Sequence, residues 1–329
     1  MSLTGWWHDS WAKGLDGFSF GFINALQLRG RSGAHDAETF QEYARHWSGV
    51  ALEEFYAVPD CPELERLPEQ GTFSFHSPLP TGCEENDRAH LDIWLGPKGW
   101  KSPAMFLLHG HMSVSDVGYR LWAKKLNQMG WTAVFFHLPY HYGRRPRGVL
   151  SGEMALSSNL IRTSEGIRQA VVELRAVSRL LRNRGCPHVG LWATSYGGWV
   201  AALLLSLESG ISTAWLLEPI VDVDWAIWES PATMVLRRQL RSRGITREMI
   251  QGHVRKLCPR WQTPRLAPER ILLLAGKFDR IATPETIREL NRKWAGSHYA
   301  ELRQGHVGYQ LMPESLRMAR ERFPELFGK

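Results

Sequence analysis

The feature that most constrains the fold is an apolar strand that stops at a serine and restarts at once as a helix. The chain is apolar from Val189 to Ala193, reaches Ser195, and becomes apolar again after Gly198. A sharp turn of this kind strains the serine backbone, and neighbouring positions must be small for strand and helix to approach. Ala193, Gly197 and Gly198 meet that demand, with alanine where glycine is more usual. The segment predicts a serine held on a sharp strand-to-helix turn, either as a nucleophile or as part of an ordinary glycine-rich turn.

Strands alternate with helices along most of the chain, which predicts a mostly parallel β-sheet with helices on both faces. The expected parallel strands are Ala104–Leu108, Thr132–His137, Val189–Ala193, Thr213–Leu217, Arg270–Ala275 and Tyr299–Leu302. The expected helices are Tyr119–Met129, Ser164–Asn183, Gly198–Glu208, Thr286–Trp294 and one at the end of the chain. Two segments that alternate with period two, Gly71–Pro78 and Ala89–Leu95, are expected to form an antiparallel pair at the sheet edge.

The organisation predicted from this pattern is one α/β domain with two additions. Residues 1–70 read as an N-terminal helical extension, and residues 71–329 as the α/β domain. Two stretches, 140–163 and 222–268, are too long for plain connections. The second contains sequence patterns typical of helices at 234–243 and 246–256, and we expect it to form a lid over the site.

Composition excludes several classes of protein. No apolar run reaches the roughly 18 to 20 residues of a membrane-spanning helix, so integral membrane association is not expected. Residues 1–9 lack a secretory signal pattern, and a cytoplasmic location is the expectation. The net charge is +7, but the arginines are spread along helices, so no nucleic-acid partner is expected. The four cysteines lack metal-binding spacing and are expected to be free thiols.

Three further polar positions follow predicted strands in an informative order. Asp279 comes just after the strand at 270–275, and His306 follows the last strand. A nucleophilic serine needs a base to take its proton and a carboxylate to orient that base, in the chain order Ser, Asp, His. His109-Gly110 ends an earlier strand, where the following loop can donate a backbone N–H to an oxyanion.

On these residues the chain resembles the α/β-hydrolase superfamily from about residue 71 to 306 and beyond, and the segment 137–146 looks like that of poorly characterised bacterial members. The resemblance implies Ser195 as nucleophile, His306 as general base and then acid, and Asp279 as the group that orients it. It also implies that the backbone N–H groups of His111 and Tyr196 form the oxyanion hole.

Two of these assignments have rivals in the sequence. The register of the loop after the first parallel strand could place Met112 in the oxyanion hole in place of His111. Asp222 and Asp224 follow the strand at 213–217 and could replace Asp279 as the acid.

The histidines and one arginine near these strand ends have other readings. His109 and His111 could be metal ligands, but no third and fourth ligand accompany them, so no metal is expected. His137, His141 and Arg144 could contact a substrate carboxylate or phosphate, or could be structural.

The function expected from the resemblance is a serine hydrolase that cleaves an ester, thioester or amide through an acyl-enzyme, with a small-molecule acyl substrate as its partner. An acyltransferase or peptidase with the same triad is one alternative, and a catalytically inactive binding protein of the same fold is another. No cofactor is expected, because the chain has no dinucleotide fingerprint and no phosphate-binding loop. The sequence leaves the oligomeric state open.

Overall fold

A computed structural model describes residues 14, 17, 19–29, 33–68, 70–308 and 310–327. It contains one eight-stranded sheet in the order β1-β2-β4-β3-β5-β6-β7-β8. Strands β3 to β8 are parallel, whereas β2 pairs antiparallel with both β1 and β4. The predicted fold class is thereby confirmed. The strands are β1 Gly71–His76, β2 Arg88–Trp94, β3 Ala104–Leu108, β4 Thr132–His137, β5 Val189–Thr194, β6 Thr213–Leu217, β7 Ile271–Gly276 and β8 His298–Leu302.

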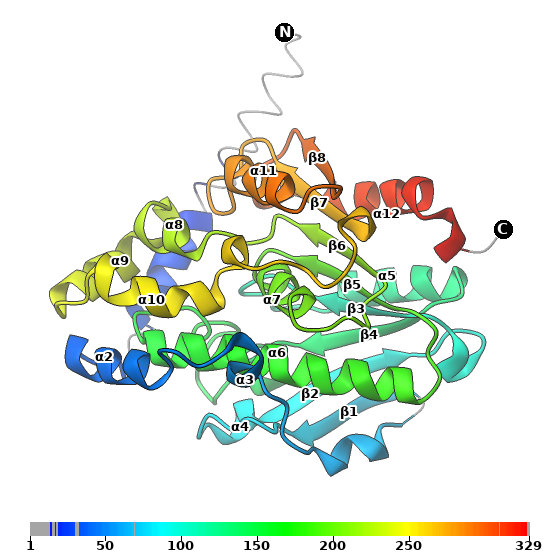
Figure 1. Ribbon diagram of the computed structural model, residues 1–329, viewed down its shortest axis with the longest axis horizontal. Coiled ribbons are helices and arrows are strands. Elements are labelled where there is room, and N and C mark those ends of the chain that lie inside the picture. The colour runs from blue at the N-terminus through cyan, green and yellow to red at the C-terminus, as the bar shows by residue number, and fades with distance from the viewer. Residues whose placement is uncertain are drawn as a thin grey trace, which may run out of the picture.

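Helices cover both faces of the sheet, as Figure 1 shows. Because neighbouring residues of a strand point to opposite faces, the central strands divide their apolar side chains between two cores. In β3, Phe106 and Leu108 join the core under α6 and α7, whereas Met105 and Leu107 join the core under α5 and α12. The helices are α2 Ala37–His46, α3 Leu52–Phe55, α4 Glu84–Asp87, α5 Val117–Gln128, α6 Leu160–Asn183, α7 Tyr196–Leu205, α8 Val223–Trp228, α9 Met234–Ser242, α10 Arg247–Leu257, α11 Pro284–Lys293 and α12 Leu311–Arg322.

Helices α8, α9 and α10 occupy the long insertion between β6 and β7, and together we call them the cap. Residues 19–29 are also helical, and they pack against the cap. Asn24 Nδ2 donates to the Pro231 carbonyl at 2.9 Å, and Gln27 Nε2 donates to the Ala232 carbonyl at 3.1 Å. Helix α2 contacts α10, beside which it lies in Figure 1. N-terminal helical residues and the cap, which are far apart in the sequence, therefore pack against each other. Residues 1–13 of the predicted extension lie outside the described residues. The prediction that residues 1–9 lack a secretory signal pattern therefore concerns residues that the structure does not describe.

Several predicted boundaries differ from the structure for local reasons. Helix α6 begins at Leu160 and not at Ser164, because the Asn159 side chain accepts from the Arg162 N–H at 2.9 Å and caps the helix there. Helix α7 begins at Tyr196, directly after the serine, and not at Gly198. Of the predicted antiparallel pair, only β1 is an edge strand, since β2 is bonded on both sides.

All four cysteines are unpaired. In the described part of the chain, none of the helices is both long and apolar enough to span a bilayer.

Candidate active site

Ser195 occupies the turn between β5 and α7 in a backbone conformation that only small neighbours permit. Its φ is 51° and its ψ is −111°, a strained combination for a residue other than glycine. A Cβ atom at position 197 would lie 2.6 Å from the Leu108 carbonyl oxygen, and one at position 198 would lie 2.9 Å from Pro219 Cα. Gly197 and Gly198 therefore allow α7 to approach β3 and the end of β6.

The structure brings Ser195, His306 and Asp279 into one chain of hydrogen bonds. Ser195 Oγ lies 2.8 Å from His306 Nε2, and His306 Nδ1 lies 2.7 Å from Asp279 Oδ2. A carboxylate can only accept, so Nδ1 carries the proton and Nε2 is left to accept from the serine hydroxyl. This arrangement can withdraw a proton from Ser195 and hold the resulting imidazolium against a carboxylate.

Asp279 is held rigidly in the loop after β7. Its Oδ1 accepts from the N–H groups of Ile281 and Ala282, at 2.7 and 2.9 Å, so Oδ2 is left for the histidine. The loops that carry Asp279 and His306 are joined by the backbone bond from the Phe278 N–H to the Gln304 carbonyl at 3.0 Å.

The rival acids have other partners. The Asp222 side chain accepts from the Trp225 N–H at the start of α8 and pairs with Arg260. The Asp224 carboxylate is paired with Arg247. Of the three candidate aspartates, only Asp279 bonds to His306.

The loop after β3 approaches Ser195. Its two candidate oxyanion donors, the N–H groups of His111 and Met112, differ in their hydrogen bonds. A Cβ atom on Gly110 would lie 3.6 Å from Ser195 Cβ, so this loop passes directly beside the serine. The Met112 N–H donates to His141 Nε2 at 3.3 Å. Among the described residues, the N–H groups of His111 and Tyr196 have no acceptor. These two amides, and not that of Met112, are available to an oxyanion.

His141 and His109 are buried, and with the partly buried His111 they form a cluster that fixes this loop. His141 Nδ1 donates to the Pro139 carbonyl at 2.8 Å, and its Nε2 accepts from Met112. His109 Nδ1 donates to the Gly110 carbonyl at 2.9 Å, and its Nε2 accepts from the Leu138 N–H at 3.1 Å. The rings of His109 and His141 each use one nitrogen as donor and one as acceptor, which requires the neutral form.

Burial is the main cause that holds these imidazoles neutral. It lowers the pKa of His109 to about 3 and that of His141 well below its usual range. Both rings are saturated by protein partners, and His111 Nε2 is bonded to the Gly152 carbonyl at 2.9 Å. The geometry therefore supports the backbone role of this loop over a metal site.

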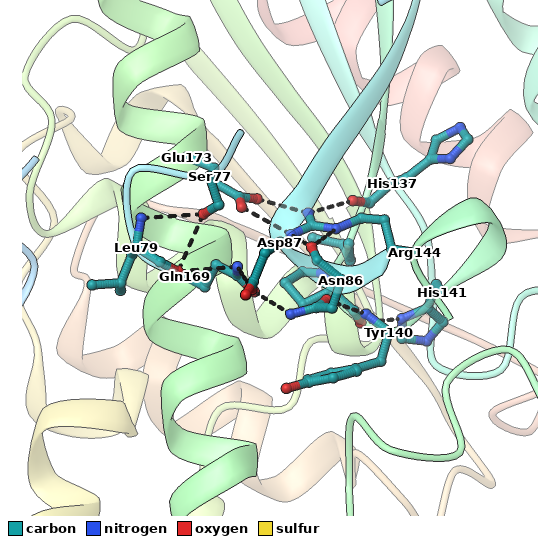
Figure 2. Close-up of polar contacts among 12 residues, drawn as sticks. Ser77, Leu79, Asn86, Asp87, His137, Tyr140, His141, Arg144, Gln169 and Glu173 are labelled. Atoms are coloured by element: carbon teal, nitrogen blue, oxygen red, sulfur yellow. Dashed lines mark hydrogen bonds and ion pairs between the residues drawn. The ribbon is translucent and has the colours of Figure 1, made fainter. Parts of the chain in front are cut away.

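Arg144 is structural and does not face a substrate. Figure 2 shows its guanidinium between Glu173 and the backbone of Asn86. It is fully buried, forms two bonds to the Glu173 carboxylate at 2.7 and 2.8 Å, and also donates to the carbonyls of Asn86 and His137. His137 Nε2 lies 3.1 Å from Asp92 Oδ2. The substrate-contact alternative for Arg144 is wrong, because burial leaves its side chain no access to a ligand.

Backbone strain is concentrated around the site. Among the described residues, the non-glycine positions with positive φ are Met112, Tyr140, Tyr142, Ser195 and Glu218. They follow β3, β4, β5 and β6, which are neighbours in the sheet. Strain of this kind persists only where the surroundings impose it, and it gathers at functional sites.

Glu218 is a buried residue of the site that the sequence reasoning missed. Oxygen atoms of Glu218 and Asp279 and a ring nitrogen of His306 lie within 4.8 Å of one another. A carboxylate directly after the apolar strand 213–217 is an unusual feature of the sequence, but it does not indicate a contact with His306. The three residues are of metal-ligand type, but both His306 nitrogens already have partners in Ser195 and Asp279.

A cavity of about 340 Å³ opens from Ser195 and His306. Its walls are mainly apolar, and they include Ile23 in the N-terminal helical segment, Leu160 in α6, and Ile227, Leu236 and Ile250 in the cap. The size lies in the range of small-molecule binding sites. The site therefore combines a serine that is hydrogen-bonded to a histidine with an apolar cavity.

No family model matches the chain. Two uncharacterised proteins from two strains of Mycobacterium tuberculosis are each 27% identical over 193 residues, which is 58% of this chain and 45% of those proteins. The match therefore spans less than half the length of these curated relatives.

Solved structures resemble the chain more extensively. Acetyl xylan esterase 1 from Thermoanaerobacterium sp. is 15% identical with a TM-score of 0.56, and the match covers 87% of this chain and 98% of that one. An esterase from Thermogutta terrifontis is 15% identical with a TM-score of 0.52, over 79% of this chain and 95% of that one. The acylaminoacyl peptidase of Pyrococcus horikoshii is 17% identical with a TM-score of 0.52, over 81% and 42% respectively. At these identities the comparison establishes the fold that the three share with this chain.

Proposed function

We propose that this chain, which has the α/β-hydrolase fold, is a serine hydrolase that cleaves an ester through an acyl-enzyme. The observation that carries the proposal is the relay from Ser195 through His306 to Asp279, at 2.8 and 2.7 Å, at the mouth of an apolar cavity. Esterases among the structural neighbours agree with it.

In the proposed reaction, His306 Nε2 takes the Ser195 proton as the oxygen attacks the substrate carbonyl. The N–H groups of His111 and Tyr196 donate hydrogen bonds to the carbonyl oxygen and stabilise the negative charge that develops on it. His306 then gives the proton to the leaving group. Water, activated by the same imidazole, releases the acid and restores the enzyme. Asp279 holds the ring in the required tautomer throughout.

The cavity favours a substrate with an apolar group larger than acetyl. Burial of each CH₂ in an apolar chamber contributes about 0.8 kcal/mol, so transition-state binding should strengthen as an acyl chain lengthens until the chamber is filled. Thioesters and amides remain within the same chemistry, because both react through the same tetrahedral intermediate.

The test is hydrolysis of p-nitrophenyl esters of increasing chain length by the wild type and by Ser195→Ala. We expect turnover with a preference for chains longer than acetyl, and a fall of about four to six orders of magnitude in the variant. Turnover that persists in Ser195→Ala would overturn the proposal. A preference for acetate esters would overturn the assignment of the apolar group.

A further inference from the structure

A second carboxylate lies beside the proposed triad. Glu218 follows β6 directly, so it stands at the same sheet edge as Ser195 after β5 and Asp279 after β7. It is only 1% exposed. One of its carboxylate oxygens lies within 4.8 Å of both an Asp279 oxygen and a His306 ring nitrogen.

The surroundings are built to keep Glu218 there. Its φ of 48° is strained, and its N–H donates to the Leu274 carbonyl at 2.8 Å. A Cβ atom at Gly276 would lie 2.7 Å from Glu218 Oε1, so the carboxylate fills space that this glycine leaves. Gln304 Nε2 donates to Glu218 Oε1 at 3.1 Å, which connects Glu218 to the loop that carries His306.

A buried carboxylate is costly unless an opposite charge or hydrogen bonds compensate it. The proposed mechanism creates such a charge when His306 becomes an imidazolium. An anion within about 4 to 6 Å of a histidine favours its charged form. Glu218 is therefore placed to stabilise the protonated, charged form of His306.

We propose that Glu218 is a positioning residue that presents a second negative charge to the His306 imidazolium, so that Glu218 and Asp279 act on the ring together. The inference rests on the proposed function. Glu218 acts through His306 and is not assigned a contact with substrate.

The other titratable groups near His306 do not imitate this effect. His111 lies close enough to interact with His306, but burial lowers the pKa of His111 to about 4, and it is neutral at higher pH. The basic residues on the adjoining loops, Lys277, Arg280 and Arg303, are exposed. Their charges are screened by water, whereas Glu218 is buried.

The decisive variant is Glu218→Gln, which removes the charge but keeps an oxygen that can accept from Gln304. The measurement is the pH dependence of kcat/KM with the p-nitrophenyl ester that the wild type cleaves fastest. Its acid limb reports the ionisation of His306 in the free enzyme. We expect the limb to move down by about one to three pH units in Glu218→Gln. Glu218→Asp, which keeps the charge, should leave it near the wild-type position.

Asp222→Asn is the matched control. Asp222 also follows β6 and its carboxylate is also buried, but that carboxylate pairs with Arg260 and not with His306. Its acid limb should stay at the wild-type position. An unmoved limb in Glu218→Gln would overturn the inference.

A second comparison serves if Glu218→Gln does not fold. In Asp279→Asn, Glu218 still faces His306, so the acid limb of the residual kcat/KM should lie near the ordinary histidine pKa of about 6.5, and a limb two or more pH units below that would contradict the inference.

Different results would contradict the role of Glu218 and the proposed serine hydrolase activity. Ester turnover that Ser195→Ala abolishes, with an unmoved limb in Glu218→Gln, would overturn the role of Glu218 alone. A wild-type chain that neither turns over an ester nor is modified at Ser195 by a fluorophosphonate would overturn the proposed function, and the role of Glu218 with it.

Discussion

Single backbone positions around Ser195 have strict steric requirements, and Gly152 gives the sharpest test. Its φ is 82°, and a Cβ atom there would lie 2.6 Å from His141 Nε2 and 2.9 Å from the Met112 nitrogen. Gly152→Ala should therefore displace the loop that carries the His111 amide. We expect kcat to fall about a hundredfold or more, the usual cost of losing one oxyanion donor.

Gly148→Ala provides the control for backbone strain. Gly148 also has a positive φ, 77°, but a Cβ atom there would meet nothing within 4 Å. This variant should lose about 1 kcal/mol of stability and keep its kcat. Equal losses of kcat in both variants would contradict the assignment of the loop.

Among single residues, those with recognisable chemistry can be predicted from the sequence. Residues whose role depends on contacts with distant parts of the chain cannot. Ser195, Asp279 and His306 follow strands in an informative order, and the structure brings them together. No local pattern reveals that His141 accepts from Met112 or that Glu218 lies beside His306. Such contacts arise only when loops after separate strands meet.

Among the elements, the loop after β4 depends on the buried pair of Arg144 and Glu173. Removal of one partner leaves an uncompensated buried charge. We expect Arg144→Met to reduce the free energy of unfolding by about 3 to 5 kcal/mol, measured by urea denaturation.

A double-mutant cycle separates the pair from the rest of the loop. Glu173→Leu alone should also destabilise the protein, whereas Arg144→Met with Glu173→Leu should cost less than the sum of the two. Strict additivity would show that the pair is not the anchor.

The cap should set the size of the acyl group. Ala226 of α8 lines the cavity, and Ala226→Phe should shorten the preferred p-nitrophenyl ester because the larger side chain occupies part of the chamber. The profile of kcat/KM against chain length measures this. An unchanged profile would mean that the cavity does not receive the acyl chain.

The elements themselves were largely predictable, because strands and helices carry strong periodicity. The main errors are at helix starts, where capping decides, as at Asn159 before α6. The packing of residues 19–29 on the cap was not predictable, because it depends on hydrogen bonds between segments about 200 positions apart, such as Asn24 with Pro231.

For the whole molecule, the buried neutral histidines predict acid lability. The folded pKa of His109 is about 3 and that of His141 is also far below its ordinary value of 6.5. Below pH 6.5 the unfolded chain binds protons at these positions that the folded chain does not. Stability is thus fully present above pH 6.5 and is lost as the pH falls toward the folded values. Each of the two should cost about 1 to 2 kcal/mol at pH 5.

The measurement is the free energy of unfolding from urea titrations between pH 7 and 5. It should fall steadily over this range. A value independent of pH would show that these two rings are not held neutral in the folded protein.

The central claim is that Ser195 is an activated nucleophile, and covalent labelling tests it most directly. The wild type and Ser195→Ala are treated with a fluorophosphonate at neutral pH, and the modified peptide is identified by mass spectrometry. The account predicts one adduct on Ser195 in the wild type and none in the variant. A folded wild-type protein that stays unlabelled, or a label at another serine that survives the substitution, would contradict it.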